Sequence, residues 1–415
     1  MTKVTHRIEQ NFGKGADHMA IQLNLYHAVA VAAVLYGLGG WMIRKIRFFE
    51  AYCIPAPLVG GLCFALLNAV LYAAGLPYIA FDSTLQTVFM NMFFTTVGFT
   101  VSLPLLVKGG KAVLLCLVLA SVLTLAQNAL GAGAMLAMGQ DPRLGLAVGS
   151  ISLIGGPGTA AAFGPDLEAA GCAGGSVVGL AAATFGLVMG SIMGGPTARR
   201  LIVTYDLKGK GGREGEVLAE DTSFVTASTN FVKSFMLILF CVGTGSWVSA
   251  VLQEVTGMTF PGYIGAMLVA VVVRNVMDGC KLAFPGEEIE TIGNMALSIF
   301  LAMAMMGLKL WELVGLAVPM VVALGLQMVL MFLFCYFLVY RVMGRNYDAA
   351  VMTAGFIGFA MGATSNAMAN MQAVTKKYGP SPTAYFAIPM VGGMFIDFVN
   401  AVVIAVMIPM LGTLA

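Results

Sequence analysis

The sequence predicts an all-α membrane protein of about ten transmembrane helices, in two inverted five-helix repeats that each contain a glycine-rich re-entrant segment. Hydrophobic residues make up 59% of the 415-residue chain and charged residues only 10%, whereas soluble domains carry about 25% charged residues. Long apolar runs recur along nearly the whole chain. A run of about eighteen residues can cross a hydrocarbon core of ~30 Å as a helix. Water is therefore not the main solvent of this chain.

The apolar runs between turn signals are the expected membrane spans. Two further apolar stretches, near 144–163 and 349–372, are interrupted by glycines and polar residues, so we expect them to be re-entrant and not spanning. The expected divisions are a polar N-terminal tail (1–23), a first repeat (24–198), a cytoplasmic linker (199–228) and a second, inverted repeat (229–415). The ten expected spans cover residues 25–42, 54–74, 85–106, 112–137, 174–195, 231–252, 263–277, 291–307, 315–340 and 386–411.

The basic residues indicate the orientation. If the amino terminus lies outside, the inner loops hold 17 of the 22 lysines and arginines. This positive-inside bias favours the ten-span count and an orientation with both termini on the outer side of the membrane. The first twenty residues have no apolar core directly behind them, so they are interpreted as a tail and not as a cleavable signal peptide. The basic residues left on the outer side are Lys3, Arg7, Lys14, Arg143 and Lys309.

The two halves resemble each other. Residues 139–161 align with 344–366 at an offset of 205, and Pro57 and Gly61 align with Pro261 and Gly265 at 204. An odd number of spans per half makes the second copy enter the membrane upside down, and inverted repeats are typical of alternating-access transporters. Chance similarity between two apolar, glycine-rich sequences is the alternative interpretation.

One acidic residue lies at membrane depth. Asp397 is within the last apolar run, whereas the other 19 acidic residues fall at flanks or in loops. A carboxylate inside a membrane is costly unless it is paired, hydrated or bound to a cation. Asn400 shares its helical face and offers another oxygen, so the pair is a candidate sodium site. A hydrogen-bonded packing role for Asp397 stays open.

The interrupted stretches are the candidate substrate site. Residues 155–158 read Gly-Gly-Pro-Gly, which cannot continue an unstrained helix. The helix that restarts there presents free amides, which suit a carboxylate. Glycine also serves close helix packing, which is the alternative. The candidate residues are Ser152, Gly156, Gly158 and Thr159 in the first stretch and Thr364, Ser365, Asn366 and Asn370 in the second.

Several function classes are disfavoured. The three histidines (His6, His18 and His27) lie in or beside the tail, so an enzyme with a histidine base or a metal centre is not expected. No P-loop pattern is present, which leaves an ion gradient as the energy source. We expect no cofactor, and the net charge of +2 gives no nucleic-acid footprint. Interhelical hydrogen bonds explain the polar residues Asn91, Gln127, Asn128 and Gln327.

From about Arg44 onward the chain resembles the bacterial sodium/glutamate symporter family. The resemblance implies two inverted five-span halves whose re-entrant loops meet near the middle, with sodium and L-glutamate bound between them. It also implies a homodimer that works by an elevator-like motion. The stretches that carry it are 149–159 (GSISLIGGPGT), 183–190 (ATFGLVMG), 300–312 (FLAMAMMGLKLWE), 344–350 (GRNYDAA) and 369–374 (ANMQAV).

Two loops depart from the family pattern. The first loop of the family reads Gly-Gly-His-Gly-Thr, but residue 157 here is proline. Its second loop reads Ala-Thr-Pro-Thr-Ala, where this chain has Ala-Thr-Ser-Asn-Ala over 363–367. The expected function is sodium-coupled import of glutamate. Another small amino acid or carboxylate, protons in place of sodium, and a passive solute channel stay open as alternatives.

Overall fold

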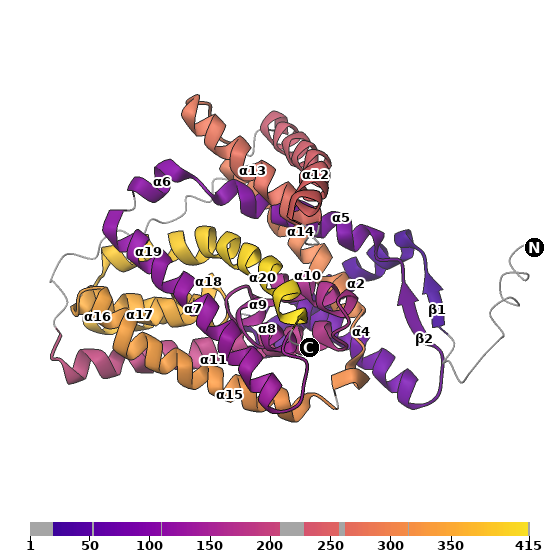
Figure 1. The fold of residues 1–415 in the computed structure, drawn as a ribbon, viewed down its shortest axis with the longest axis horizontal. Helices are drawn as coiled ribbons and strands as arrows, with labels where there is room; N and C mark the ends of the chain where they lie inside the picture. Colours follow the sequence, from indigo (N-terminus) through magenta and orange to yellow (C-terminus); the bar gives the residue numbers. More distant parts are fainter. Residues whose placement is uncertain are drawn as a thin grey trace, which may run out of the picture.

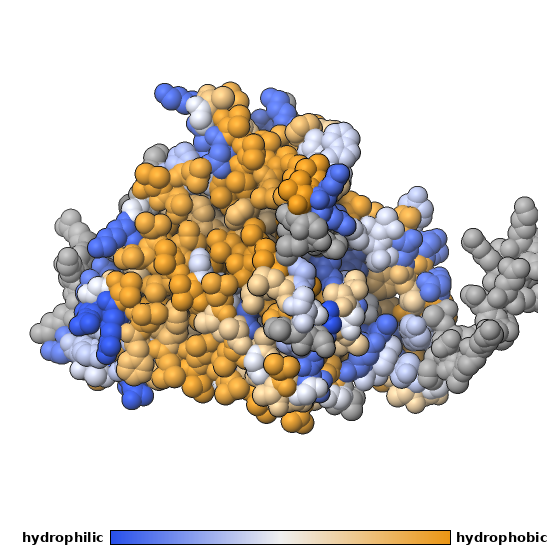
Figure 2. Space-filling view, in the orientation of Figure 1, coloured by the Kyte–Doolittle hydropathy of each residue, from blue (hydrophilic) through white to orange (hydrophobic). Residues whose placement is uncertain are grey.

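The computed structural model describes residues 20–51, 54–108, 110–207, 228–256, 262–313 and 315–413. Nine helical stretches in these ranges are long and apolar enough to cross a membrane. Apolar residues cover most of the face in Figure 2, and hydrophilic residues gather toward its left and right edges. The stretches are α2 (Leu25–Lys45), α4 (Ala56–Ala73), α7 (Gly110–Ala137), α11 (Gly175–Thr204), α12 (Ser228–Thr256), α13 (Gly262–Gly279), α14 (Gly286–Met306), α15 (Ala317–Leu333) with its continuation to Val342, and 382–412.

The expected span over 85–106 is divided in the structure. Helix α5 (Thr84–Thr100) has 17 residues, and α6 (Leu103–Lys108) follows after a break at Val101 and Ser102. Pro104 lies in the first turn of α6, where its missing N–H needs no partner, so a new helix can start there. Helix α5 is therefore shorter than the nine long helices, at the lower limit of about 17 residues for a membrane span.

A small parallel sheet departs from the all-α expectation. Strand β1 (Ala20–Leu23), at the end of the expected tail, pairs with β2 (Tyr78–Phe81), with Ala20 opposite Tyr78. The buried Asn68 on α4 donates to the carbonyl of Ile79 and accepts from its N–H, both at 2.9 Å. This contact depends on the tertiary fold, because an amide side chain on α4 completes the hydrogen bonding of the strand.

The structure describes one end of the expected tail and both ends of the expected linker. Helix α11 continues to Thr204, so residues 199–204 of the expected linker are helical. Helix α12 begins at Ser228. Residues 1–19 and 208–227, which hold the rest of the expected tail and linker, lie outside the described residues.

The helices form two packed groups. In one, α12 packs on α13, α13 on α5, α5 on α14, and α14 on α4 and α2. In the other, α11 packs against both interrupted segments and α15 packs against α7. Figure 1 shows α12 and α13 at the top, apart from α11 and α15 at the bottom. Contacts of α14 with α10 (Gly156–Ala169), and of α5 and α13 with α20 (Ile396–Gly412), join the two groups.

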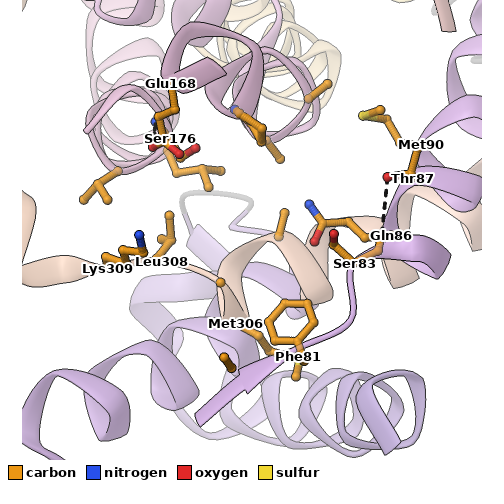
Figure 3. Close-up of a pocket in the computed structure, with 18 of the residues that line it drawn as sticks. Phe81, Ser83, Gln86, Thr87, Met90, Glu168, Ser176, Met306, Leu308 and Lys309 are labelled. Atoms are coloured by element: carbon orange, nitrogen blue, oxygen red, sulfur yellow. Dashed lines mark hydrogen bonds between the residues drawn. The ribbon is translucent and has the colours of Figure 1, made fainter. Parts of the chain in front are cut away.

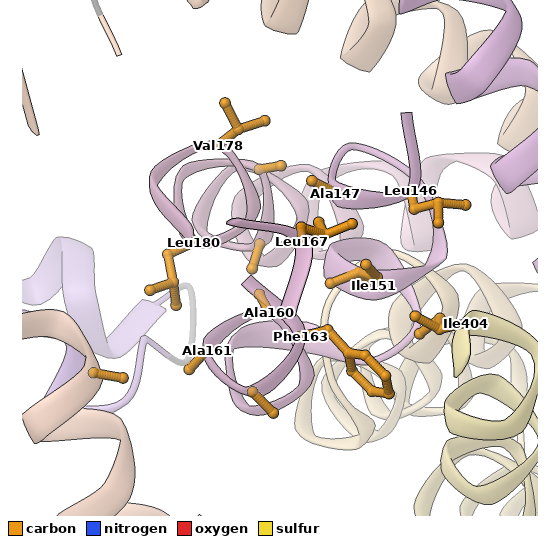
Figure 4. Packing of buried hydrophobic residues seen from close by; sticks show 14 of the residues in the cluster. Leu146, Ala147, Ile151, Ala160, Ala161, Phe163, Leu167, Val178, Leu180 and Ile404 are labelled. Atoms are coloured by element: carbon orange, nitrogen blue, oxygen red, sulfur yellow. The ribbon is translucent and has the colours of Figure 1, made fainter. Parts of the chain in front are cut away.

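Two segments consist of short helices with breaks between them. The first interrupted segment contains α8 (Leu144–Ala147), α9 (Ser150–Leu153) and α10. The second contains α17 (Tyr347–Ala360) and α18 (Thr364–Tyr378). Figure 4 shows buried side chains of the first segment, including Ile151 and Phe163, packed with Val178 of α11 and Ile404 of α20. The breaks are therefore held inside a tightly packed core.

Candidate functional site

The first interrupted segment opens around its glycines. Gly149 has non-helical backbone angles, and Gly156 has a φ of +64°, in the left-handed region that favours glycine. Pro157 follows in the first turn of α10, where a proline needs no N–H partner. The sequence Gly-Gly-Pro-Gly thus ends one helix and starts another, as the glycine and proline pattern predicts.

The second interrupted segment opens between α17 and α18. Ala363 is fully extended (φ −164°, ψ 162°), and α18 starts at Thr364. No acceptor in the described part of the chain takes the backbone N–H of Thr364, Ser365 or Asn366. The first turn of a helix leaves such donors free for a ligand. This break contains no proline, and its helix ends where Met361 leaves helical angles.

The two breaks touch each other. A Cβ placed on Gly156 would lie 2.9 Å from the carbonyl oxygen of Gly362. A Cβ on Gly186 of α11 would lie 2.4 Å from the carbonyl oxygen of Met361. Only glycine permits both approaches, so α11 and the first break lie directly against the second.

Three of the polar residues predicted for the substrate form hydrogen bonds to backbone carbonyls. The Ser152 hydroxyl donates to the carbonyls of Ala147 and Gly179. Asn366 Nδ2 donates to the carbonyl of Leu187 at 2.8 Å, and Asn370 Nδ2 to that of Gly190 at 2.9 Å. These side chains attach the interrupted segments to α11. Gly158 and Thr159 lie in the first turn of α10, and Ser365 is exposed.

The last helix approaches both breaks. A π-helical turn, η3 (Val391–Phe395), precedes α20, and π-turns recur at functional sites. The Thr364 hydroxyl donates to the carbonyl of Gly392 at 2.9 Å, and Asn400 Nδ2 donates to the carbonyl of Ser150 at 3.0 Å. The structure thus brings Asn400 to the first break and Thr364 to the turn before Asp397.

Asp397 is half-buried on α20. Within the described residues it has neither a hydrogen bond nor an ion pair, whereas Asn400, one turn later, is fully buried. An acid held at membrane depth without a partner retains its full need for a cation or a proton. The structure therefore places the two predicted sodium ligands on one helix but in different surroundings.

A cavity of about 640 Å³ lies beside the breaks, between α5, α10, α14 and β2. None of the predicted site residues lines it, but Ala161 and Ala162, on the turn of α10 after Thr159, do. Figure 3 shows Glu168 and Lys309 on one side of the cavity and Gln86 and Thr87 on the other. Both charge signs thus line the cavity, which suits a zwitterionic solute.

Two acidic residues that line this cavity, Asp166 and Glu168, were not predicted from the sequence. Asp166 lies just beyond the expected end of the first re-entrant stretch, and its carboxylate accepts from the Tyr263 hydroxyl at 2.5 Å. Glu168 accepts from the Ser176 N–H at 2.9 Å. Their only signal in the sequence was their closeness to the interrupted stretch. Among the described residues, no three His, Cys, Asp or Glu side chains gather as a metal cluster.

The long apolar helices define a multi-pass membrane protein. A model of the sodium/glutamate symporter family matches residues 21–380. The chain is 35% identical to the sodium/glutamate symporter of Haemophilus influenzae, over 96% of this chain and all of that protein. It is 40% identical to the sodium/glutamate symporters of Escherichia coli and Shigella flexneri, over 91% of this chain and 96% of theirs. The chain belongs to the sodium/glutamate symporter family, which confirms the resemblance and the expectation of a transporter.

Proposed function

We propose that this protein imports glutamate together with sodium by alternating access. The observation that carries the proposal is the meeting of two interrupted segments, where Gly156 lies against the carbonyl of Gly362. Relatives that span nearly all of the chain are sodium/glutamate symporters.

The helix starts at the two breaks suit a carboxylate. The N-terminus of a helix carries roughly half a positive charge and free N–H groups. Helices α10 and α18 both start at the breaks, and no cationic side chain is needed there. In this proposal the amides near Gly156 and Gly158, with Thr159, bind one carboxylate of glutamate. Ser365 and the first N–H groups of α18 bind the remaining polar groups. The hydrogen bonds of Ser152, Asn366 and Asn370 to backbone carbonyls hold the breaks in position.

Asp397 and Asn400 are the proposed sodium ligands. Both are on α20, and each side chain offers a free oxygen in the described structure. Sodium, as a hard cation, prefers oxygen ligands. More than one sodium per glutamate would make the transport electrogenic, because one charge moved across 100 mV contributes about 2.3 kcal/mol.

The proposed topology has ten spans, with α5 as the tenth, in two inverted five-helix repeats. In this arrangement the interrupted segments are re-entrant, both termini are periplasmic and the membrane is the bacterial inner membrane. The two packed groups of helices support an elevator-like motion, in which the group with both interrupted segments moves against the other. In a homodimer, the group that contains α2, α4, α5, α12, α13 and α14 would remain fixed.

The test is uptake of labelled glutamate into proteoliposomes with a controlled sodium gradient. We expect uptake to need inward sodium, to saturate with glutamate and to increase with a negative interior. Uptake that depends on a proton gradient and not on the sodium gradient would show that the coupling ion is the proton. Flux that never saturates with glutamate would indicate a channel. If another amino acid or a dicarboxylate competes for uptake more strongly than glutamate does, that compound would be the substrate.

A further inference from the structure

An open cleft of about 580 Å³ lies between the ends of α11 and α18. Arg199 and Arg200 from α11 and Lys377 from α18, here called the cleft cations, line it, and no acidic residue of the described chain does. Its other walls are mainly apolar and include Pro196 and Val203. The end of α11 lies at the left edge in Figure 1, where hydrophilic residues gather in Figure 2. The cleft therefore combines positive charge with apolar surface.

The contacts within the described chain do not account for these charges. None of the ion pairs among the described residues includes a cleft cation. Basic residues near the end of a helix compensate its negative C-terminus. This accounts for Lys377, which lies with Lys376 in the last turn of α18. It does not account for Arg199 and Arg200, because they lie before the last turn of α11, which holds no basic residue.

Aromatic side chains beside the cleft indicate a membrane–water interface. The rings of Tyr205 and Tyr340 stack with centroids 5.3 Å apart, and the guanidinium of Arg200 lies 5.7 Å from the centroid of the Tyr336 ring. Tyrosines are enriched at the level of the lipid headgroups. In the proposed topology this end of the molecule faces the cytoplasm, and the cytoplasmic leaflet carries a negative surface potential. The cleft is therefore placed at the depth of anionic headgroups.

We propose that this cleft binds an anionic phospholipid of the cytoplasmic leaflet. The phosphate lies against the cleft cations, since guanidinium groups form strong charge-assisted hydrogen bonds with phosphate oxygens. The acyl chains lie along the apolar wall, where Val203 is 65% exposed. A free phosphate would use the charges and leave this wall uncovered. Basic pockets between helices on the cytoplasmic side are a known form of lipid recognition.

The position of the lipid gives it a structural role. Asn366 and Asn370 of α18 already bond to carbonyls of α11 at 2.8 and 2.9 Å. The cleft joins the far ends of the same two helices. A lipid bound there holds the end of the second interrupted segment against α11. This binding depends on neither the transported solute nor the coupling ion.

The experiment measures thermal unfolding of the purified full chain in detergent, without glutamate, while phosphatidylglycerol or phosphatidylcholine is added. Phosphatidylglycerol should raise the unfolding temperature more than phosphatidylcholine does. Arg200→Gln and Lys377→Gln should each increase the half-maximal phosphatidylglycerol concentration about fivefold or more, because each basic side chain near an anionic lipid contributes about this factor. Inorganic phosphate at the same concentrations should not stabilise the wild type. If it does so as well as the lipid, a soluble anion occupies the cleft and the assignment is wrong.

Two control variants separate a defined cleft from general attraction of lipid to a basic surface. Lys376→Gln removes the neighbouring charge, which is exposed and does not line the cleft, so it should leave the half-maximal concentration close to that of the wild type. Gly195→Leu keeps every charge and fills the cleft, because a Cβ on Gly195 would meet no atom within 4 Å. It should weaken lipid binding as much as the loss of a cleft cation.

Three results would overturn the assignment. Equal shifts for Lys376→Gln and Lys377→Gln, with none for Gly195→Leu, would show that the lipid is attracted to the whole basic surface. A loss of stability in Arg200→Gln that is the same with and without phosphatidylglycerol would mean that this charge acts within the protein. An equal response of the wild type to both lipids, or a response to neither, would show that the cleft does not select an anionic headgroup.

Discussion

Replacing Gly186 by alanine should separate the two breaks from α11. The new Cβ would lie 2.4 Å from the carbonyl oxygen of Met361, which is about 1 Å short of ordinary contact. The obstacle is backbone, so the second break must shift. Overpacking of this kind costs about 1–3 kcal/mol. A displacement of about 1 Å can lower the rate of a preorganised site on the order of 10²-fold, so we expect glutamate uptake to decrease at least tenfold.

Gly179→Ala is the control on the same helix. A Cβ there would meet Ala160 Cβ at 3.6 Å, an ordinary contact. Replacing glycine by alanine inside a helix stabilises it by about 1 kcal/mol. Initial uptake rates in proteoliposomes and thermal unfolding in detergent should therefore separate the variants, with Gly179→Ala close to wild type in uptake and at least as stable. Equal uptake and equal stability of both variants would refute the packing of α11 against the second break.

Three further changes test other contacts. Asp397→Asn should raise the sodium concentration for half-maximal uptake about tenfold or more, because a carboxylate ligand is lost; an unchanged sodium curve would exclude the role of Asp397. Thr364→Val should lower the unfolding free energy by about 1 kcal/mol, since it removes the hydrogen bond to Gly392, and unchanged thermal unfolding would contradict this. The hydrogen bonds of Arg143 lower the pKa of Asp141 in the folded state. The ionised Asp141 therefore stabilises the fold fully above its unfolded pKa of about 3.9, and this stabilisation is lost as the pH falls through the lowered folded-state pKa. Arg143→Gln should therefore cost up to about 1 kcal/mol more at neutral pH than in strong acid, where only its hydrogen bond to the carbonyl of Ala170 is still lost. A difference from wild type that does not change with pH would count against the ion pair.

The sequence by itself determined the membrane class and the places where the chain is interrupted. Apolar length decides whether a helix can span a bilayer, and nine expected spans coincide with long helices. Gly-Gly-Pro-Gly over 155–158 predicted the first break, because proline and glycine act on the local backbone whatever surrounds them. The family resemblance was also carried by local residue runs, and the family match confirms it.

Only the tertiary structure decided what each polar side chain does. Ser152, Asn366 and Asn370 were candidates for the substrate, but their donors bind carbonyls of the interrupted segment and α11. Asn400 was paired with Asp397 by helical spacing, yet its amide reaches Ser150, 250 positions away. Such partners depend on which helices pack together, and spacing along one helix carries no information about the helix that lies opposite it.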